Sequence, residues 1–161
     1  MKKKINTIFS FVSGMILGSF LFFCIVKPII LKKRRLQELS DKHLRMFLLM
    51  NDWVRIKQNK KNLTSYFEKR GYEEIAIYGM SYIGETLIRE LSNTKVRVVY
   101  AIDKQKEGDS SNIDIIAPDN VLPKVDCIVV TAIFYYEELL ATLSNKIKCP
   151  IVSLEDVLLE L

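Results

Sequence analysis

The sequence predicts an α/β protein, with a small parallel sheet of about five strands and helices on both faces. Two N-terminal helices, one transmembrane and one amphipathic, are expected to precede the sheet. Strand-like apolar runs at 74–79, 95–102 and 125–131 are separated by helical patterns. These runs lack polar alternation, which is typical of parallel strands covered on both faces. A glycine turn after the first run and an acidic residue after the second match the order of a βαβ unit.

The first expected element is a transmembrane anchor within residues 1–31. Residues 5–26 form 22 consecutive positions without a charge, with Lys2–Lys4 before them and five Lys and Arg closely after them. At about 1.5 Å per residue, such a helix crosses a hydrocarbon core of about 30 Å. The run is long for a cleaved signal peptide, and no small-residue cleavage site follows it. The basic excess after the run favours a cytoplasmic C-terminal domain on a single-pass protein of the cell membrane.

Small residues in this anchor suggest self-association. Ser10, Gly14 and Gly18 recur every four residues on one helical face, where small side chains allow close helix approach in lipid. We therefore expect that the chain can form a homodimer.

Residues 32–61 are expected to form a basic amphipathic juxtamembrane helix and a linker. Apolar positions recur at alternating three- and four-residue steps, as in a coiled-coil seam: Leu36, Leu39, His43, Met46, Met50 and Trp53. This face can pack on a second copy of the chain, on the folded domain or on the membrane surface. His43 is expected to be a packed or interfacial residue rather than a base, because no acid or nucleophile is spaced to serve it.

The charge is divided between the two halves of the chain. Residues 1–61 hold 14 Lys and Arg against three acidic residues, whereas residues 62–161 hold 10 against 16. The folded part is therefore acidic and would repel phosphate backbones, which excludes nucleic acid as a partner.

The domain at 62–161 is predicted to alternate strands and helices. Asn62 is expected to cap a helix at 63–70, which ends at Gly71 in a left-handed conformation. The predicted strands are 74–79, 95–102, 113–116, 125–131 and 150–153, and the later helices are 82–92, 135–146 and 154–161.

The segment from Gly79 to Asp103 predicts a Rossmann-like nucleotide site. Gly79 would make the tight turn after the first strand, and Gly84 would let the next helix pack closely. Ser81 stands where the backbone approaches a pyrophosphate. Asp103, 24 residues after Gly79, can accept from ribose hydroxyls, which favours NAD or a nucleotide sugar over NADP. The alternative is that both glycines serve the turn and packing alone.

The candidate ligand-binding residues follow from this unit and from the carboxyl ends of its strands. They are Gly79, Met80, Ser81, Tyr82, Ile83, Gly84, Asp103, Lys104 and Thr131. Tyr135 and Tyr136 are further candidates beside Thr131, with helix packing as the alternative for both.

The sequence contains no recognisable catalytic set. The domain has no His, no Gly-x-Ser-x-Gly motif and no Tyr-x-x-x-Lys pair at Tyr135 or Tyr136. Cys24, Cys127 and Cys149 lack disulfide or metal spacing and fit small buried residues in a reducing compartment. We therefore predict no metal and no complete enzyme, although a partner chain could complete an active site.

Five segments carry a family resemblance: YEEIAIYGM at 72–80, VYAID at 99–103, DIIAPD at 114–119, LPKVDCIVVTA at 122–132 and PIVSLED at 150–156. Together they resemble small bacterial membrane-anchored Rossmann-like proteins of capsule and exopolysaccharide biosynthesis loci. They are also similar to the nucleotide-binding N-terminal domains of sugar-nucleotide dehydratase and epimerase enzymes of polysaccharide biosynthesis. The relatives commonly carry Gly-x-Gly or Gly-x-Gly-x-x-Gly at the first turn, so Gly79 and Gly84 match and Ser81 departs.

The resemblance spans residues 50–161 and implies an accessory role. It implies a nucleotide-binding protein, for NAD or a nucleotide sugar, that works with polysaccharide-assembly proteins. The catalytic domain of the larger enzymes has no counterpart in this sequence. The alternative is a ligand-free scaffold or dimerisation protein of a membrane assembly complex.

Overall fold

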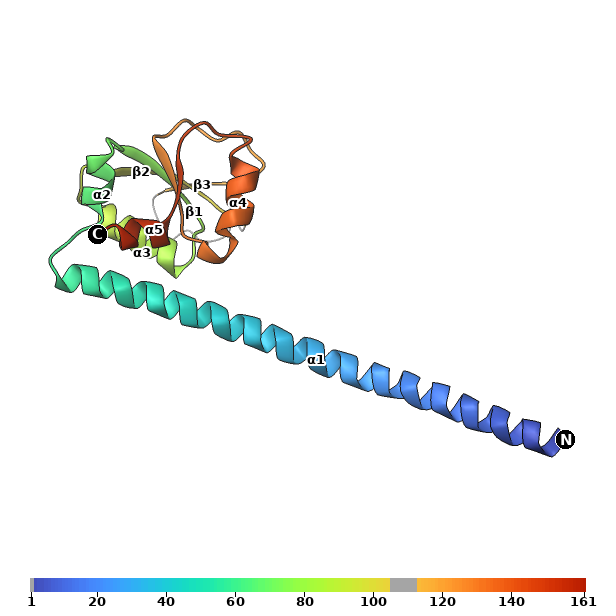
Figure 1. Cartoon of the computed structure of the whole chain (residues 1–161). Helices are drawn as coiled ribbons and strands as arrows, with labels where there is room; N and C mark the ends of the chain where they lie inside the picture. Colours follow the sequence, from blue (N-terminus) through green and yellow to red (C-terminus); the bar gives the residue numbers. More distant parts are fainter. Residues whose placement is uncertain (1, 105–112) are drawn as a thin grey trace. The chain divides into compact units, whose positions relative to one another are not determined.

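The computed structural model describes residues 2–104 and 113–161, and in the first helix it leaves out the side chains of residues 2–14 and 16–21. The chain divides into two compact units, residues 1–47 and residues 48–161. Helix α1, Lys2–Gln58, is one continuous helix that includes Pro28 and contributes to both units (Figure 1). Among the residues with described side chains, no helix has the length and apolar character needed to cross a membrane. The predicted anchor at 5–26, with Ser10, Gly14 and Gly18, lies mostly outside those residues.

A parallel sheet forms the centre of the second unit, as predicted. In the described part of the chain it has five strands in the order β3-β2-β1-β4-β5. The strands are β1 Glu74–Tyr78, β2 Arg97–Ile102, β3 Asp114–Ile116, β4 Cys127–Val130 and β5 Ile151–Ser153. This is the order of a doubly wound, Rossmann-like sheet, whose winding direction reverses between β1 and β4.

Helices cover both faces of this sheet. They are α2 Thr64–Lys69, α3 Tyr82–Leu91, α4 Tyr136–Leu143 and α5 Leu154–Leu159, with a 3₁₀ turn, η1, at Ile133–Tyr135. Figure 1 shows α4 across the sheet from α2 and α3. Ala76 and Tyr78 of β1 share a buried cluster with Leu143 of α4. Strand side chains alternate between faces, so Ile75 and Ile77 lie on the opposite face.

The last turns of α1 are part of the folded unit. Leu49, Trp53 and Ile56 are buried there, and only 3% of the Trp53 surface is exposed. Lys57 Nζ lies 2.6 Å from Glu90 Oε1 on α3. The sequence left three packing partners open for this helix: a second copy of the chain, the folded domain and the membrane surface. Its C-terminal turns pack on the folded domain. His43, farther along α1, is exposed in the structure.

The ends of two predicted helices illustrate where local signals succeed and fail. Asn62 Oδ1 accepts from the Ser65 N–H at 3.1 Å, so the predicted cap at the start of α2 is present. Gly71 has φ +69° and its N–H bonds to Glu68 O, as predicted for the helix end. The predicted helix at 135–146 is shorter in the structure, because the 3₁₀ turn η1 precedes α4 and α4 ends at Leu143.

Candidate functional site

The turn between β1 and α3 requires both of its glycines. Gly79 has φ +104°, and a Cβ there would lie 2.8 Å from Thr131 Oγ1 and 3.2 Å from the Ala132 nitrogen. At Gly84 a Cβ would lie 2.2 Å from Gly79 O. The absence of side chains therefore lets α3 begin directly against the turn. Backbone conformation and packing require these residues whether or not a ligand binds.

Asp103 ties this turn to the end of β2. Its Oδ2 accepts a hydrogen bond from the Met80 N–H at 2.7 Å. The Gly79 N–H donates to Ile102 O at 2.9 Å, one residue before Asp103. The acid predicted to bind ribose thus also orders the turn, and it occupies a backbone N–H that a phosphate could otherwise approach.

Thr131 supports the same turn from the end of β4. Its hydroxyl oxygen lies 2.6 Å from Gly79 O and 3.1 Å from Tyr78 O, so it donates to the carbonyls that end β1. Only 2% of Thr131 is exposed. The buried hydroxyl therefore stabilises the turn and is not exposed to a ligand.

A cavity of about 440 Å³ opens at the carboxyl ends of the strands. It is lined by Tyr78, Gly79, Asp103, Lys104, Ala132, Tyr135, Glu138 and Leu139. Tyr78 ends β1, Gly79 follows it, and the others follow β2 or β4 or belong to η1 and the start of α4. The cavity therefore lies where the winding direction reverses, the place at which open α/β sheets bind ligands.

The charges around this cavity favour the binding of ligand groups that are polar but uncharged. Asp103 and Glu138 contribute two carboxylates against one ammonium group, that of Lys104. Glu138 and Lys104 are exposed at the rim, whereas Asp103 is half-buried. Hydroxyl groups can donate to such carboxylates, whereas an anion inside the cavity would be repelled by them. Leu139 adds an apolar wall.

The structure brings only some of the predicted ligand-binding residues together. Gly79, Asp103 and Lys104 line the cavity, while Met80 and Thr131 hold the turn beside it.

The remaining predicted residues begin α3 and are not among those that line the cavity. The Ser81 hydroxyl makes no capping hydrogen bond at this helix start. Tyr82 is 83% exposed, whereas Ile83 is buried in the core and Gly84 packs on the turn.

The two candidate tyrosines at the start of α4, Tyr135 and Tyr136, have different environments. Tyr135 lines the cavity. The Tyr136 hydroxyl instead donates to Ile151 O at 3.0 Å, which is the packing role that the sequence left open.

Sequence reasoning missed four residues that line the cavity: Tyr78, Ala132, Glu138 and Leu139. Tyr78 resembles any other member of an apolar strand, although its position directly before Gly79 was a usable signal. Glu138 resembles a solvated helix residue, because its adjacent acid Glu137 suggests an outward face.

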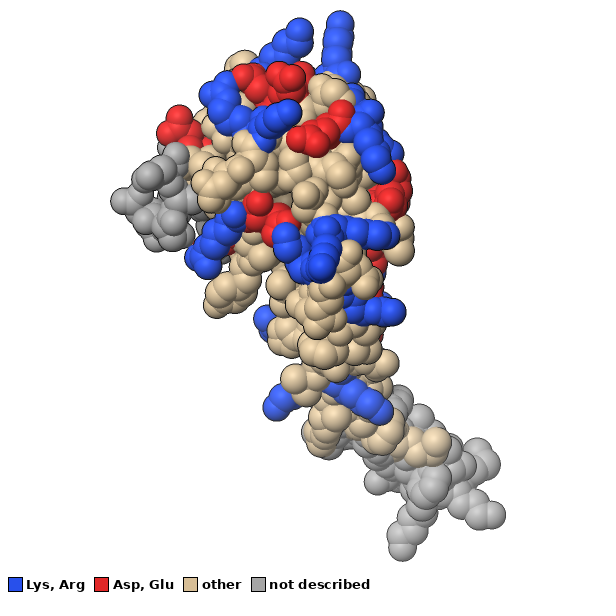
Figure 2. All heavy atoms as spheres, turned by 90° about the vertical axis from the view of Figure 1, so that its left-hand side faces the viewer, with Lys and Arg blue, Asp and Glu red and all other residues tan. Residues whose placement is uncertain are grey.

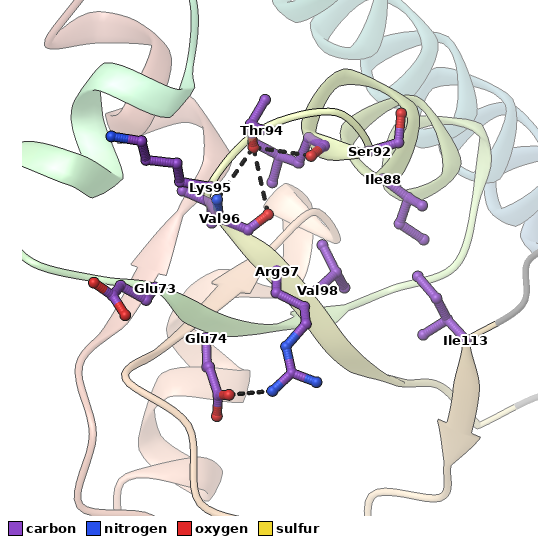
Figure 3. Close-up of a pocket in the computed structure, with 11 residues that line it drawn as sticks. Glu73, Glu74, Ile88, Ser92, Thr94, Lys95, Val96, Arg97, Val98 and Ile113 are labelled. Atoms are coloured by element: carbon purple, nitrogen blue, oxygen red, sulfur yellow. Dashed lines mark hydrogen bonds and ion pairs between the residues drawn. The ribbon is translucent and has the colours of Figure 1, made fainter.

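A second cavity of about 520 Å³ lies at the opposite, amino-terminal edge of β1 and β2. Figure 3 shows Glu74 paired with Arg97 at this cavity. The Thr94 hydroxyl is bonded to backbone groups of Leu91 and Val96. These polar groups are paired with protein atoms, and this edge is not the one at which α/β sheets place ligands.

Acidic and basic side chains are interspersed on the face of the folded unit that Figure 2 shows. Ion pairs in the described part of the folded unit include that of Arg70 with Glu160, at 2.5 Å. Within the described residues, no three His, Cys, Asp or Glu side chains gather in a way that could hold a metal ion.

Comparison with known proteins adds no assignment to this geometry: no family model, no curated protein and no solved structure matches the chain.

Proposed function

We propose that this chain is a membrane-anchored, nucleotide-binding accessory protein of bacterial surface-polysaccharide biosynthesis. Its ligand would be NAD or a nucleotide sugar, and its folded domain would lie on the cytoplasmic side. The observation that supports ligand binding most strongly is the cavity at the winding reversal between β1 and β4, with Asp103 in its wall.

The geometry favours binding over catalysis. Asp103 offers a carboxylate to ribose hydroxyls, and Leu139 and Tyr135 offer apolar and aromatic surface. Because Met80 N–H is bonded to Asp103, the phosphates would lie outside the cavity, toward the start of α3. The pathway and the polysaccharide-assembly partners are proposed from the resemblance of the sequence segments alone.

Ligand binding is tested by thermal unfolding of the full chain with NAD(H), NADP(H), and UDP-, GDP- and dTDP-sugars at millimolar concentration. A ligand present at 100 times its dissociation constant should add about 2.7 kcal/mol of stability. Arg97→Gln, at the second cavity, is the control that should retain the shift. The absence of a shift with every compound would reject the proposal.

Membrane anchoring needs its own experiment, because it depends on the uncharged run at 5–26. The full chain should remain with bacterial membranes after alkaline carbonate extraction, whereas a chain that begins at residue 32 should be released. Release of the full chain would contradict the anchor.

A ligand-free scaffold is the second candidate, and a specific observation favours it. Leu49 and Trp53 of α1 pack on the folded unit, yet their neighbours Leu48 and Val54 are 49% and 51% exposed. The helix therefore carries exposed apolar side chains on both sides of its buried stripe, on which a second copy of the chain could pack. The turn is also complete without a ligand, because protein groups satisfy Met80 N–H and Gly79 O.

Light scattering of the purified chain tests this scaffold. The wild-type protein should be a dimer, and the double variant Leu48→Glu with Val54→Glu should be a monomer. Arg55→Ala, at an exposed polar position next to Val54, should remain a dimer. A monomeric wild-type protein would reject dimerisation.

A further inference from the structure

Three tyrosines lie in or against the buried cluster between the sheet and α4, and two of them have clear hydrogen-bond partners. The Tyr100 hydroxyl donates to Pro123 O at 2.7 Å, and the Tyr136 hydroxyl donates to Ile151 O at 3.0 Å. The third, Tyr78, is only 7% exposed. Across residues 2–104 and 113–161, no group forms a hydrogen bond with its hydroxyl, although its backbone carbonyl accepts from Thr131.

An unbonded hydroxyl at this depth needs a partner. A buried polar group without a hydrogen bond is unfavourable, and native proteins satisfy nearly all such groups with protein, water or ligand atoms. Tyr78 lines the 440 Å³ cavity, and its side chain lies on the same face of the sheet as α4. A group that occupies the cavity can therefore supply this partner.

The charges near Tyr78 restrict the chemistry of this partner. Burial raises the pKa of Tyr78, and the carboxylates of Asp103, Asp119 and Glu138 raise it further. The phenol therefore remains protonated at neutral pH and can donate as well as accept. The same carboxylates oppose an anionic partner. A ligand hydroxyl can accept from Tyr78 and donate to a neighbouring carboxylate, so it satisfies both groups.

We infer that Tyr78 is a ligand-binding residue that hydrogen-bonds a ribose hydroxyl placed in the cavity beside Asp103. This inference rests on the proposed function, because the ribose belongs to the bound nucleotide. It adds a recognition residue in the strand itself, one position before the glycine turn. The phosphates of the same ligand remain outside the acidic cavity.

Calorimetric titration of the full chain with NAD⁺ and UDP-glucose tests the inference in two tyrosine variants. Tyr78→Phe removes only the hydroxyl oxygen, and it should weaken binding at least tenfold without lowering the melting temperature. Tyr100→Phe is the matched control, because its hydroxyl bonds Pro123 O rather than facing the cavity. It should lower the melting temperature and leave the affinity unchanged.

A second measurement identifies the hydroxyl. UDP and ADP are compared with their 2′,3′-dideoxy analogues in the wild-type protein and in Tyr78→Phe. Removing the ribose hydroxyls should weaken binding to the wild-type protein and have a much smaller effect in the variant, because the same contact is already lost.

The outcomes separate this inference from the proposed function. Equal affinity of Tyr78→Phe and the wild-type protein for NAD⁺ and UDP-glucose overturns the role of Tyr78 while ligand binding stands. An equal dideoxy penalty in both proteins, or no binding of either diphosphate, overturns the ribose assignment. A wild-type protein that binds none of these compounds overturns both proposals.

Discussion

The Asp103 carboxylate at the end of β2 accepts a hydrogen bond from the Met80 N–H in the turn after β1, with 2.7 Å between Oδ2 and nitrogen. One side chain thus orders the turn and also lines the cavity beside it. A carboxylate has about four acceptor positions, so the bond to Met80 is compatible with acceptance from a ligand hydroxyl. A ligand hydroxyl bound to Asp103 would therefore be coupled to the order of the turn.

Removing this carboxylate should affect stability and binding together. Asp103→Ala leaves the Met80 N–H without its partner, and we expect a loss of about 1–2 kcal/mol in the free energy of unfolding. Asp103→Asn keeps an acceptor oxygen and should lose less. Urea denaturation of both variants measures the difference. Identical stability of Asp103→Ala and the wild-type protein would show that the bond does not hold the turn.

The close approach of α3 to the turn predicts a large effect at Gly84. In Gly84→Ala the new methyl group would meet Gly79 O at 2.2 Å, so the helix must shift at a cost of about 1–3 kcal/mol. Gly71→Ala is the control, because nothing lies within 4 Å of that position and only its φ of +69° is unfavourable. Its cost should be about 1 kcal/mol. Chemical denaturation compares the two, and a greater loss in Gly71→Ala would contradict the packing at Gly84.

Asp126 should make stability depend on acid pH. Its Oδ2 accepts from the Glu74 N–H at 2.8 Å and the Glu73 N–H at 2.9 Å, and these bonds lower its pKa below the ordinary 3.8. The unfolded chain then binds a proton more readily than the folded chain. The stabilisation is therefore complete above the unfolded pKa and is lost as the pH falls through the folded pKa.

Urea midpoints measured between pH 2 and pH 6 check this dependence against Asp126→Asn, which cannot ionise. The wild-type protein should lose more stability than the variant as the pH falls below 3.8. Parallel pH profiles for the two proteins would show that Asp126 makes no contribution.

Trp53 should be the main connection between the end of α1 and the folded unit. It is 3% exposed, so Trp53→Ala should cost about 3–5 kcal/mol. The adjacent Val54 is 51% exposed, and Val54→Ala should change stability by no more than about 0.5 kcal/mol. Thermal unfolding distinguishes them, and a small effect at Trp53 would contradict the docking of these helix turns.

Much of the fold is predictable from local sequence because its signals are strong and short in range. The run from Glu74 to Tyr78, the turn at Gly79 and the helix that follows agree closely with the structure. The cap at Asn62 and the left-handed Gly71 were also predictable, since each depends on neighbouring residues only. The 3₁₀ turn at Ile133–Tyr135 was not, because its apolar pattern equally suits an α-helix.

The cavity was less predictable because it depends on which face each strand residue occupies. In an all-apolar strand, the apolar pattern does not separate Tyr78 from Ile77, and only the position of Tyr78 directly before Gly79 distinguishes it as a cavity residue. Glu138 lies on a helix whose rotation is set by tertiary packing. The bond between Asp103 and Met80 joins groups 23 residues apart, and no local pattern encodes it.

The proposed function requires that a nucleotide binds in the cavity at the carboxyl ends of β1, β2 and β4. An NMR titration of the ¹⁵N-labelled full chain with UDP-glucose and NAD⁺ tests this requirement. Saturable shifts are expected for the amide resonances of Gly79, Asp103, Lys104 and Ala132, which line that cavity. Unchanged spectra, or shifts confined to Glu74 and Arg97 at the opposite edge of the sheet, would contradict it.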